Sequence, residues 1–138
     1  MISRPLGELA ETMGIRLVEA SADCVVATMP VIGNRQPLGL LHGGATALLA
    51  ETVGSVASHL SAGPGRFAVG IELNISHHRS ATDGTVTATA TPLSRGKTLA
   101  VYQIAIVDEA GRSISTARLT CLLRDSDKRP TPVGPTPL

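Results

Sequence analysis

Aromatic side chains are almost absent from this chain: its 138 residues include one Tyr, one Phe and no Trp. Hydrophobic residues still make up 43% of the composition, so the core must be aliphatic, built from Val, Leu, Ile and Ala. Cysteine is also scarce, and Cys24 and Cys121 are too few for a disulfide framework. Reduced thiols in the cytoplasm are therefore the simplest expectation.

An excess of charge and a long apolar run are missing as well. The formal net charge is +1, which gives no electrostatic reason to expect a nucleic-acid or membrane partner. No stretch approaches the roughly 20 apolar residues that span a bilayer, and the N-terminus lacks the apolar run of a signal peptide. The length suits one domain, and we expect a cytoplasmic protein.

What is present is a regular succession of helix and strand patterns. A short helix is expected over 5–13, one long helix over 43–60, and strands over 15–20, 24–30, 67–77, 85–91, 99–107 and 113–123. Short turns between the later strands, such as Asp83-Gly84, imply antiparallel pairing. The sequence thus predicts an α+β domain over residues 1–123, in which an antiparallel sheet wraps around one long helix. Residues 124–138 are rich in proline and lack apolar periodicity, so we expect a disordered tail there.

The long helix over 43–60 is apolar or small nearly all round, which is typical of a buried helix. Gly44, Ala47, Gly54 and Ser58 belong to a small face that would let another backbone approach closely. One helix cannot cover both faces and the edges of a sheet. A chain of this size is therefore expected to form an oligomer.

Glu51 stands out in this helix, because burying an unpaired carboxylate costs several kcal/mol, and a chain that keeps such a group usually uses it. Ser55 lies one turn further on and could hydrogen-bond Glu51. At the helix start, Gly43 offers unpaired backbone N–H groups and the positive end of the dipole, which would stabilise an anionic oxygen. A carboxylate in such a site can act as a general base or attack a carbonyl. The alternative is that His42 caps the helix, Glu51 forms a salt bridge and the glycines serve packing alone.

The order of these residues resembles that of a known family. The stretch QPLGLLHGGA over 36–45, followed by Glu51 and Gly54-Ser55, is similar to the hotdog-fold acyl-CoA thioesterases that depend on a glutamate. Within that family, the likeness is to the 4-hydroxybenzoyl-CoA thioesterases, the PaaI-like thioesterases of phenylacetate degradation and the 1,4-dihydroxy-2-naphthoyl-CoA thioesterases. It continues through VGIELN over 69–74 and HHRSA over 77–81, and it covers nearly all of residues 5–123.

The resemblance implies a role for each residue of the motif. Glu51 would be the nucleophile or general base, and the backbone N–H of Gly43 would hold the thioester oxygen. Gln36 and His42 would bind and polarise the thioester, while the hydroxyl of Ser55 would support the glutamate or the water. The site would lie at a dimer interface, where Glu51 of one subunit faces the other subunit's helix start. A homotetramer of such dimers is the expected assembly.

The resemblance also implies a path for coenzyme A, which is part of the substrate rather than a separate cofactor. Arg79 and the turn Gly96-Lys97-Thr98 fall where relatives contact the nucleotide phosphates, and cations and turn N–H groups suit phosphate. For the turn, the alternative is a basic loop in solvent with no ligand.

The acyl group would lie near Val56, His59 and Phe67, together with His77 or His78. No metal site is expected from these two histidines, because adjacent strand residues point to opposite faces. The family resemblance favours an aromatic or otherwise bulky acyl group, although the acyl group itself cannot be read from the residues.

Taken together, the residues and the resemblance predict an acyl-CoA thioesterase that converts R–CO–S–CoA to the free acid and CoA without metal or redox cofactor. Two alternatives stay open at this stage. One is a non-catalytic acyl-CoA-binding protein on the same fold. The other is a hotdog dehydratase that acts on acyl thioesters, although its usual Asp/His arrangement is not visible.

Overall fold

The structure is a computed structural model that describes residues 2–130. Its elements follow one another along the chain as α1 (Glu8–Thr12), β1 (Arg16–Ala20), β2 (Val25–Pro30), α2 (Gly43–Ala62), β3 (Arg66–His77), β4 (Thr85–Arg95), β5 (Leu99–Val107), β6 (Ser113–Asp125) and the 3₁₀ helix η1 (Ser126–Lys128).

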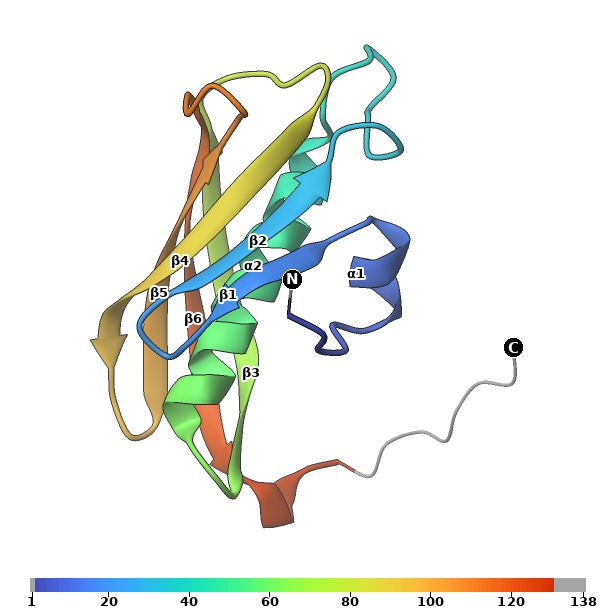
Figure 1. Ribbon diagram of the computed structural model, residues 1–138. Coiled ribbons are helices and arrows are strands. Elements are labelled where there is room, and N and C mark those ends of the chain that lie inside the picture. Colours follow the sequence, from blue (N-terminus) through green and yellow to red (C-terminus); the bar gives the residue numbers. More distant parts are fainter. Residues whose placement is uncertain (1, 131–138) are drawn as a thin grey trace.

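The six strands form one sheet in the order β1-β2-β4-β5-β6-β3, and all neighbouring strands are antiparallel. The helix α2 packs against β2 through β6, and Figure 1 shows the sheet curving around it. β3 pairs with β6 on one side only, so its other side is a free sheet edge. The predicted antiparallel sheet around one long helix is confirmed.

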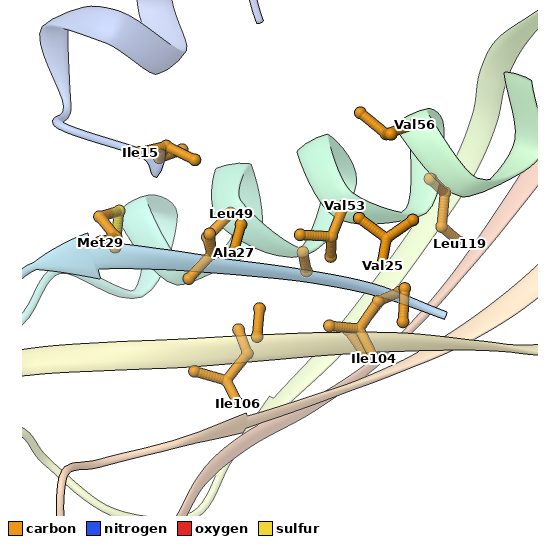
Figure 2. Packing of buried hydrophobic residues seen from close by; sticks show 14 of the residues in the cluster. Ile15, Val25, Ala27, Met29, Leu49, Val53, Val56, Ile104, Ile106 and Leu119 are labelled. Atoms are coloured by element: carbon orange, nitrogen blue, oxygen red, sulfur yellow. The ribbon is translucent and has the colours of Figure 1, made fainter. Parts of the chain in front are cut away.

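The core between α2 and the sheet is aliphatic, as the composition predicts. Leu49 and Val53 of α2 are fully buried, and Figure 2 shows them facing apolar side chains of the strands, among them Ile104. Burial of each such side chain contributes about 1.5–3 kcal/mol. Tyr102 is the aromatic exception: it is fully buried, and its hydroxyl donates to the carbonyl of Ala22 at 2.5 Å.

The small residues of α2 serve packing against the protein's own sheet. A Cβ added to Gly54 would lie 2.6 Å from Cδ2 of Leu119, and Ser58 is completely buried. The prediction that this small face admits a second backbone is therefore wrong for these two positions. Glu51, by contrast, is exposed to solvent, so its predicted burial does not occur within a single chain.

Several segments depart from their predicted bounds, and the largest differences are at α1, β4 and the end of β6. α1 is shorter than the predicted 5–13, because Gly7 adopts a φ of 93° and the helix begins only after it. β4 continues past Pro92, where a register shift against β5 accommodates the missing N–H.

β6 runs to Asp125 and η1 follows it, so part of the predicted tail is ordered. Residues 131–138 lie outside the described part of the chain, and the disorder expected there stays a prediction. Within residues 2–130, no helix is long and apolar enough to cross a membrane.

Candidate active site

Two clefts hold all the motif residues with an expected role except His42, and they share no lining residue. The first, the glutamine cleft, has a volume of about 340 Å³ and is lined by Gln36, Leu40, Leu41, Gly43, Thr46, His77, His78, Arg79, Ser80, Ala81 and Ile114. The second, the glutamate cleft, has a volume of about 570 Å³ and is lined by Arg4, Pro5, Leu6, Leu48, Glu51, Thr52, Ser55, Val56, His59, Ala68 and Arg129.

Gly43 forms the floor of the glutamine cleft as the first residue of α2. A Cβ at this position would lie 2.9 Å from Nε2 of His77, so the close approach of the imidazole requires a glycine. The ring of His77 is held from its other side, because Nδ1 lies 2.9 Å from Oγ of Ser115 and 3.4 Å from Oγ1 of Thr46. Within residues 2–130, the backbone N–H of Gly43 has no hydrogen-bond acceptor and is free to bind an anionic oxygen.

Gln36 is fixed in the same cleft by the loop that precedes α2. Its backbone N–H donates to the carbonyl oxygen of Leu40 at 2.7 Å, and its side-chain oxygen accepts a hydrogen bond from the backbone N–H of Leu38. With its oxygen engaged, the side chain presents its NH₂ group as a donor. Gln36 and Gly43 thus place two donors in one cleft, and their binding of a thioester stays a prediction.

His42 is the N-cap of α2, so one part of the packing alternative is correct. Its Nδ1 accepts a hydrogen bond from the backbone N–H of Gly44 at 2.8 Å. The neutral imidazole consequently carries its proton on Nε2, where it can still donate. The exposed ring lies in a neighbouring cleft beside Arg35 and Leu48, rather than in the glutamine cleft.

Glu51 extends over β3 in the glutamate cleft. A Cβ on Gly70 would lie 2.8 Å from Oε1 of Glu51, so a glycine at this point of the strand makes room for the carboxylate. β3 also shifts register against β6 between Gly70 and Glu72. Within residues 2–130, Glu51 has no salt-bridge or hydrogen-bond partner, so the salt bridge of the packing alternative is absent.

Ser55 lines the glutamate cleft beside Glu51, and no hydrogen bond joins the two side chains within the described chain. Its expected support of the glutamate or the water stays a prediction. Cys121 lies beneath both residues on β6. Its burial raises the pKa of its thiol, which leaves it protonated near neutral pH and unsuited to act as a nucleophile. The carboxylate of Glu51 therefore stays the predicted nucleophile or base of this cleft.

His59 and Val56 line the same cleft as Glu51, as predicted, whereas Phe67 does not. The reason is the alternation of β3: Ala68, the next residue, faces the cleft. Burial lowers the pKa of His59, and the positive charges of Arg4 and Arg129 lower it further. His59 is therefore neutral near pH 7.

The two predicted phosphate contacts lie far apart in the protein. Arg79 is exposed in the glutamine cleft, just after the end of β3. The turn Gly96-Lys97-Thr98 lies at the other end of that strand, where Nη2 of Arg66 donates to the carbonyl of Lys97 at 2.8 Å. One chain therefore does not bring both contacts together.

His77 and His78 both line the glutamine cleft, and neither lines the glutamate cleft, but their side chains have different partners. His77 contacts the start of α2, whereas Nε2 of His78 lies 2.8 Å from Oγ1 of Thr116. Among residues 2–130, no group of three His, Cys, Asp or Glu side chains is placed to hold a metal ion.

Sequence reasoning missed Arg4 and Arg129 in the glutamate cleft, and Gly70 beside the carboxylate of Glu51. Both arginines belong to segments remote from the motif, and no local pattern marks them. Gly70 carries a signal that could have been used, because an isolated glycine within a strand pattern suggests a bulge or a close approach.

Comparison with known proteins agrees with the fold and the motif. The profile of the family described as "Thioesterase superfamily" matches residues 38–115. The 1,4-dihydroxy-2-naphthoyl-CoA hydrolase of Escherichia coli is 44% identical over 115 residues, which are 83% of this chain and 85% of that protein. The proofreading thioesterase EntH of Cronobacter turicensis is also 44% identical, over 83% of this chain and 85% of its own length.

Solved structures give the same picture. A thioesterase of Haemophilus influenzae superposes with a TM-score of 0.82 at 38% identity, and the match covers 86% of this chain and 83% of that one. A Staphylococcus aureus protein has been solved as a Gln-to-Ala variant (36% identity, TM-score 0.80, 84% and 98% of the chains) and as a Glu-to-Ala variant (37%, 0.81, 86% and 99%). The two substituted positions are as far apart in that chain as Gln36 and Glu51 are in this one.

Proposed function

Since the chain belongs to the thioesterase superfamily and has its hotdog fold, we propose that it hydrolyses acyl-CoA thioesters to the free acid and CoA, with Glu51 as the acting carboxylate. One observation carries the role of Glu51. Its carboxylate is unpaired within residues 2–130, and Gly70 makes room for it in a cleft large enough for an acyl group.

The complete site requires two subunits. The free N–H of Gly43 and the amide of Gln36 lie in one cleft and Glu51 in the other, while a thioester carbonyl must contact all three at once. Both clefts open beside β3, because Gly43 lies against His77 and Glu51 against Gly70. The free edge of β3 is long enough to pair with a second copy, and a two-fold axis there would bring unlike clefts together.

The residues divide the reaction between them. Glu51 attacks the carbonyl carbon or removes a proton from a water that attacks it, so a C–O bond forms and the carbonyl oxygen becomes negative. The N–H of Gly43 stabilises that oxygen, and such a donor is worth about 10²–10³ in rate. The C–S bond then breaks and CoA leaves as a thiolate. If Glu51 attacks directly, a water then cleaves the anhydride between the acyl group and Glu51 and restores the carboxylate. In both routes one water supplies the OH of the acid and the proton that the thiolate takes up.

The remaining roles concern binding. Arg79, exposed beside Gly43, is placed to contact the CoA phosphates as its thioester enters the glutamine cleft. Lys97 is the weaker candidate, since it would have to act from the other end of β3 or from another subunit. We further propose a PaaI-like enzyme that acts on an aromatic or bulky acyl group and works in the cytoplasm as a homotetramer built from these dimers.

A panel of acyl-CoA thioesters tests the function. We expect the wild-type chain to release free CoA, detected with a thiol reagent, and the Glu51→Gln variant to lose this activity while it still binds the thioesters. Glu8→Gln is the matched control, since Glu8 is an exposed glutamate on α1 outside both clefts. Binding without release of CoA in the wild type would indicate a binding protein, and an enoyl thioester product would indicate a dehydratase.

A further inference from the structure

The glutamate cleft continues well beyond the carboxylate that gives it its name. Glu51, Ser55 and His59 follow one another at intervals of four residues along one side of α2, so His59 lies about 12 Å along the helix from Glu51. Besides the hydroxyls of Thr52 and Ser55, the lining contains the apolar side chains of Leu6, Leu48, Val56 and Ala68. An acyl chain that starts at Glu51 would therefore run along apolar side chains toward His59.

The far end of the cleft is positively charged. Arg4, from the segment before α1, and Arg129, from the segment after η1, both line the cleft near His59. Among residues 2–130, neither guanidinium has a carboxylate within salt-bridge distance. The arginines outside this cleft that do have such partners are Arg35, Arg66, Arg95, Arg112 and Arg118.

Two unpaired guanidinium groups from opposite ends of the chain repel each other, and half-buried Arg4 is also partly desolvated. An anion between them would remove both costs. The neutral imidazole of His59 could add an N–H donor to the same anion.

We propose that Arg4 and Arg129, together with His59, bind a carboxylate at the far end of the acyl group, so that the enzyme prefers acyl-CoA thioesters whose acyl chain is itself anionic. This proposal rests on the proposed thioesterase function. We assign the anion to the acyl group rather than to CoA, because the two arginines and His59 line the same cleft as Glu51 and several apolar side chains. Arg79, the proposed CoA contact, lines the glutamine cleft instead.

Pairs of substrates that differ only in the charge of the acyl group test this proposal. We expect the wild-type enzyme to hydrolyse 4-carboxybenzoyl-CoA and ω-carboxyacyl-CoA thioesters with a higher kcat/KM than the corresponding carboxamides, which have the same shape without the charge. The expected ratio is about ten- to hundredfold, the usual effect of one or two hydrogen bonds to a charged group. Among ω-carboxyacyl chains of increasing length, the ratio should peak where the carboxylate reaches the arginines.

Arginine variants locate the effect. Arg4→Met and Arg129→Met should each lower kcat/KM for the carboxylates about tenfold and leave the carboxamides unchanged. Lys128→Met is the matched control, because it removes a positive charge next to Arg129 from a residue that does not line the cleft. Its carboxylate-to-carboxamide ratio should equal that of the wild type.

Acyl-pantetheine thioesters separate the two sources of an anion. If the arginine variants weaken carboxylate and carboxamide CoA thioesters equally, and leave acyl-pantetheine thioesters unaffected, the cluster binds CoA phosphate and the proposal is overturned. It is also overturned if the variants lower only the melting temperature, since the arginines would then merely offset the dipole at the end of α2.

The same experiments distinguish a failure of this proposal from a failure of the proposed function. Glu51-dependent hydrolysis without any preference for carboxylates would remove the proposal and leave the function standing. If no thioester is hydrolysed, the proposed function fails. Binding then tests the present proposal alone: the affinity for S-(ω-carboxyalkyl)-CoA thioethers is compared with that for the corresponding carboxamides, in the wild type and in Arg129→Met. A preference that the variant loses supports it, and equal affinities overturn it.

Discussion

The two clefts beside α2 differ in how far hydrogen bonds within the chain already fix their side chains. In the glutamine cleft the groups are held in place: Gln36 is fixed by its own loop, and His77 is held by Ser115. In the glutamate cleft, Glu51 and Arg129 are exposed and unpaired within residues 2–130. The comparison teaches that one chain makes a rigid hydrogen-bonding half and an unpaired charged half in separate clefts, which supports the proposal that a second copy joins them.

The largest expected effect follows from removing the carboxylate of Glu51 from the glutamate cleft. Glu51→Ala should lower kcat by a factor of about 10² or more, the contribution expected of a catalytic base or nucleophile. Because the side chain is exposed, the free energy of unfolding should change by less than about 0.5 kcal/mol. Steady-state hydrolysis and thermal unfolding measure the two quantities. A variant that keeps a tenth of the wild-type rate would contradict the assignment.

A mixed dimer of two inactive variants, one altered in each cleft, is the sharpest test of whether a site combines the two clefts of different subunits. Gln36→Ala and Glu51→Ala should each be nearly inactive as pure dimers. A mixed dimer purified with two different tags should recover about half of the wild-type kcat, because one of its two sites then contains both intact residues. A mixed dimer as inactive as its parents would show that each site is built within one chain.

The sequence predicted the protein's framework well, because local patterns set it. The alternation over 85–91 and the turn at Asp83-Gly84 placed β4, and the continuous run of small and apolar residues placed α2 within two residues of its ends. The motif also led to Glu51. What it could not give was the exposure of Glu51, because a helix that is apolar nearly all round does not reveal which side lies at the sheet edge.

The charged end of the glutamate cleft was equally beyond local patterns. Arg4 and Arg129 are separated by nearly the whole chain, and only the tertiary structure brings both to His59. Neither belongs to a motif, and isolated arginines near chain ends are usually solvated. Their meeting depends on where the N-terminal segment and η1 pack, which no periodicity in the sequence encodes.

A smaller effect on activity is expected from a change that displaces the carboxylate of Glu51. Gly70→Ala would place a methyl group 2.8 Å from the present position of Oε1, so the carboxylate must move. We expect kcat to fall about tenfold with little change in KM, because small misplacements of a reacting group are costly while binding contacts remain. The control is the double variant with Glu51→Ala, which should lose no more activity than Glu51→Ala alone. Additive losses would mean that Gly70 acts on something other than the carboxylate.

The smallest effect concerns the charge at the far end of the glutamate cleft, and NMR titration of His59 measures it. Burial lowers the pKa of His59, and Arg4 and Arg129 lower it further, so Arg129→Met should raise this pKa while Lys128→Met leaves it unchanged. Because the pKa of the folded state lies below the unfolded value of about 6.5, the unfolded chain takes up the proton first as the pH falls. The free energy of unfolding should therefore decrease from about pH 6.5 down to the folded pKa, and Arg129→Met should narrow that window. A pKa that is the same in Arg129→Met and wild type would mean that the guanidinium does not reach His59, and the glutamate cleft would then lack the charged end that sets it apart from the glutamine cleft.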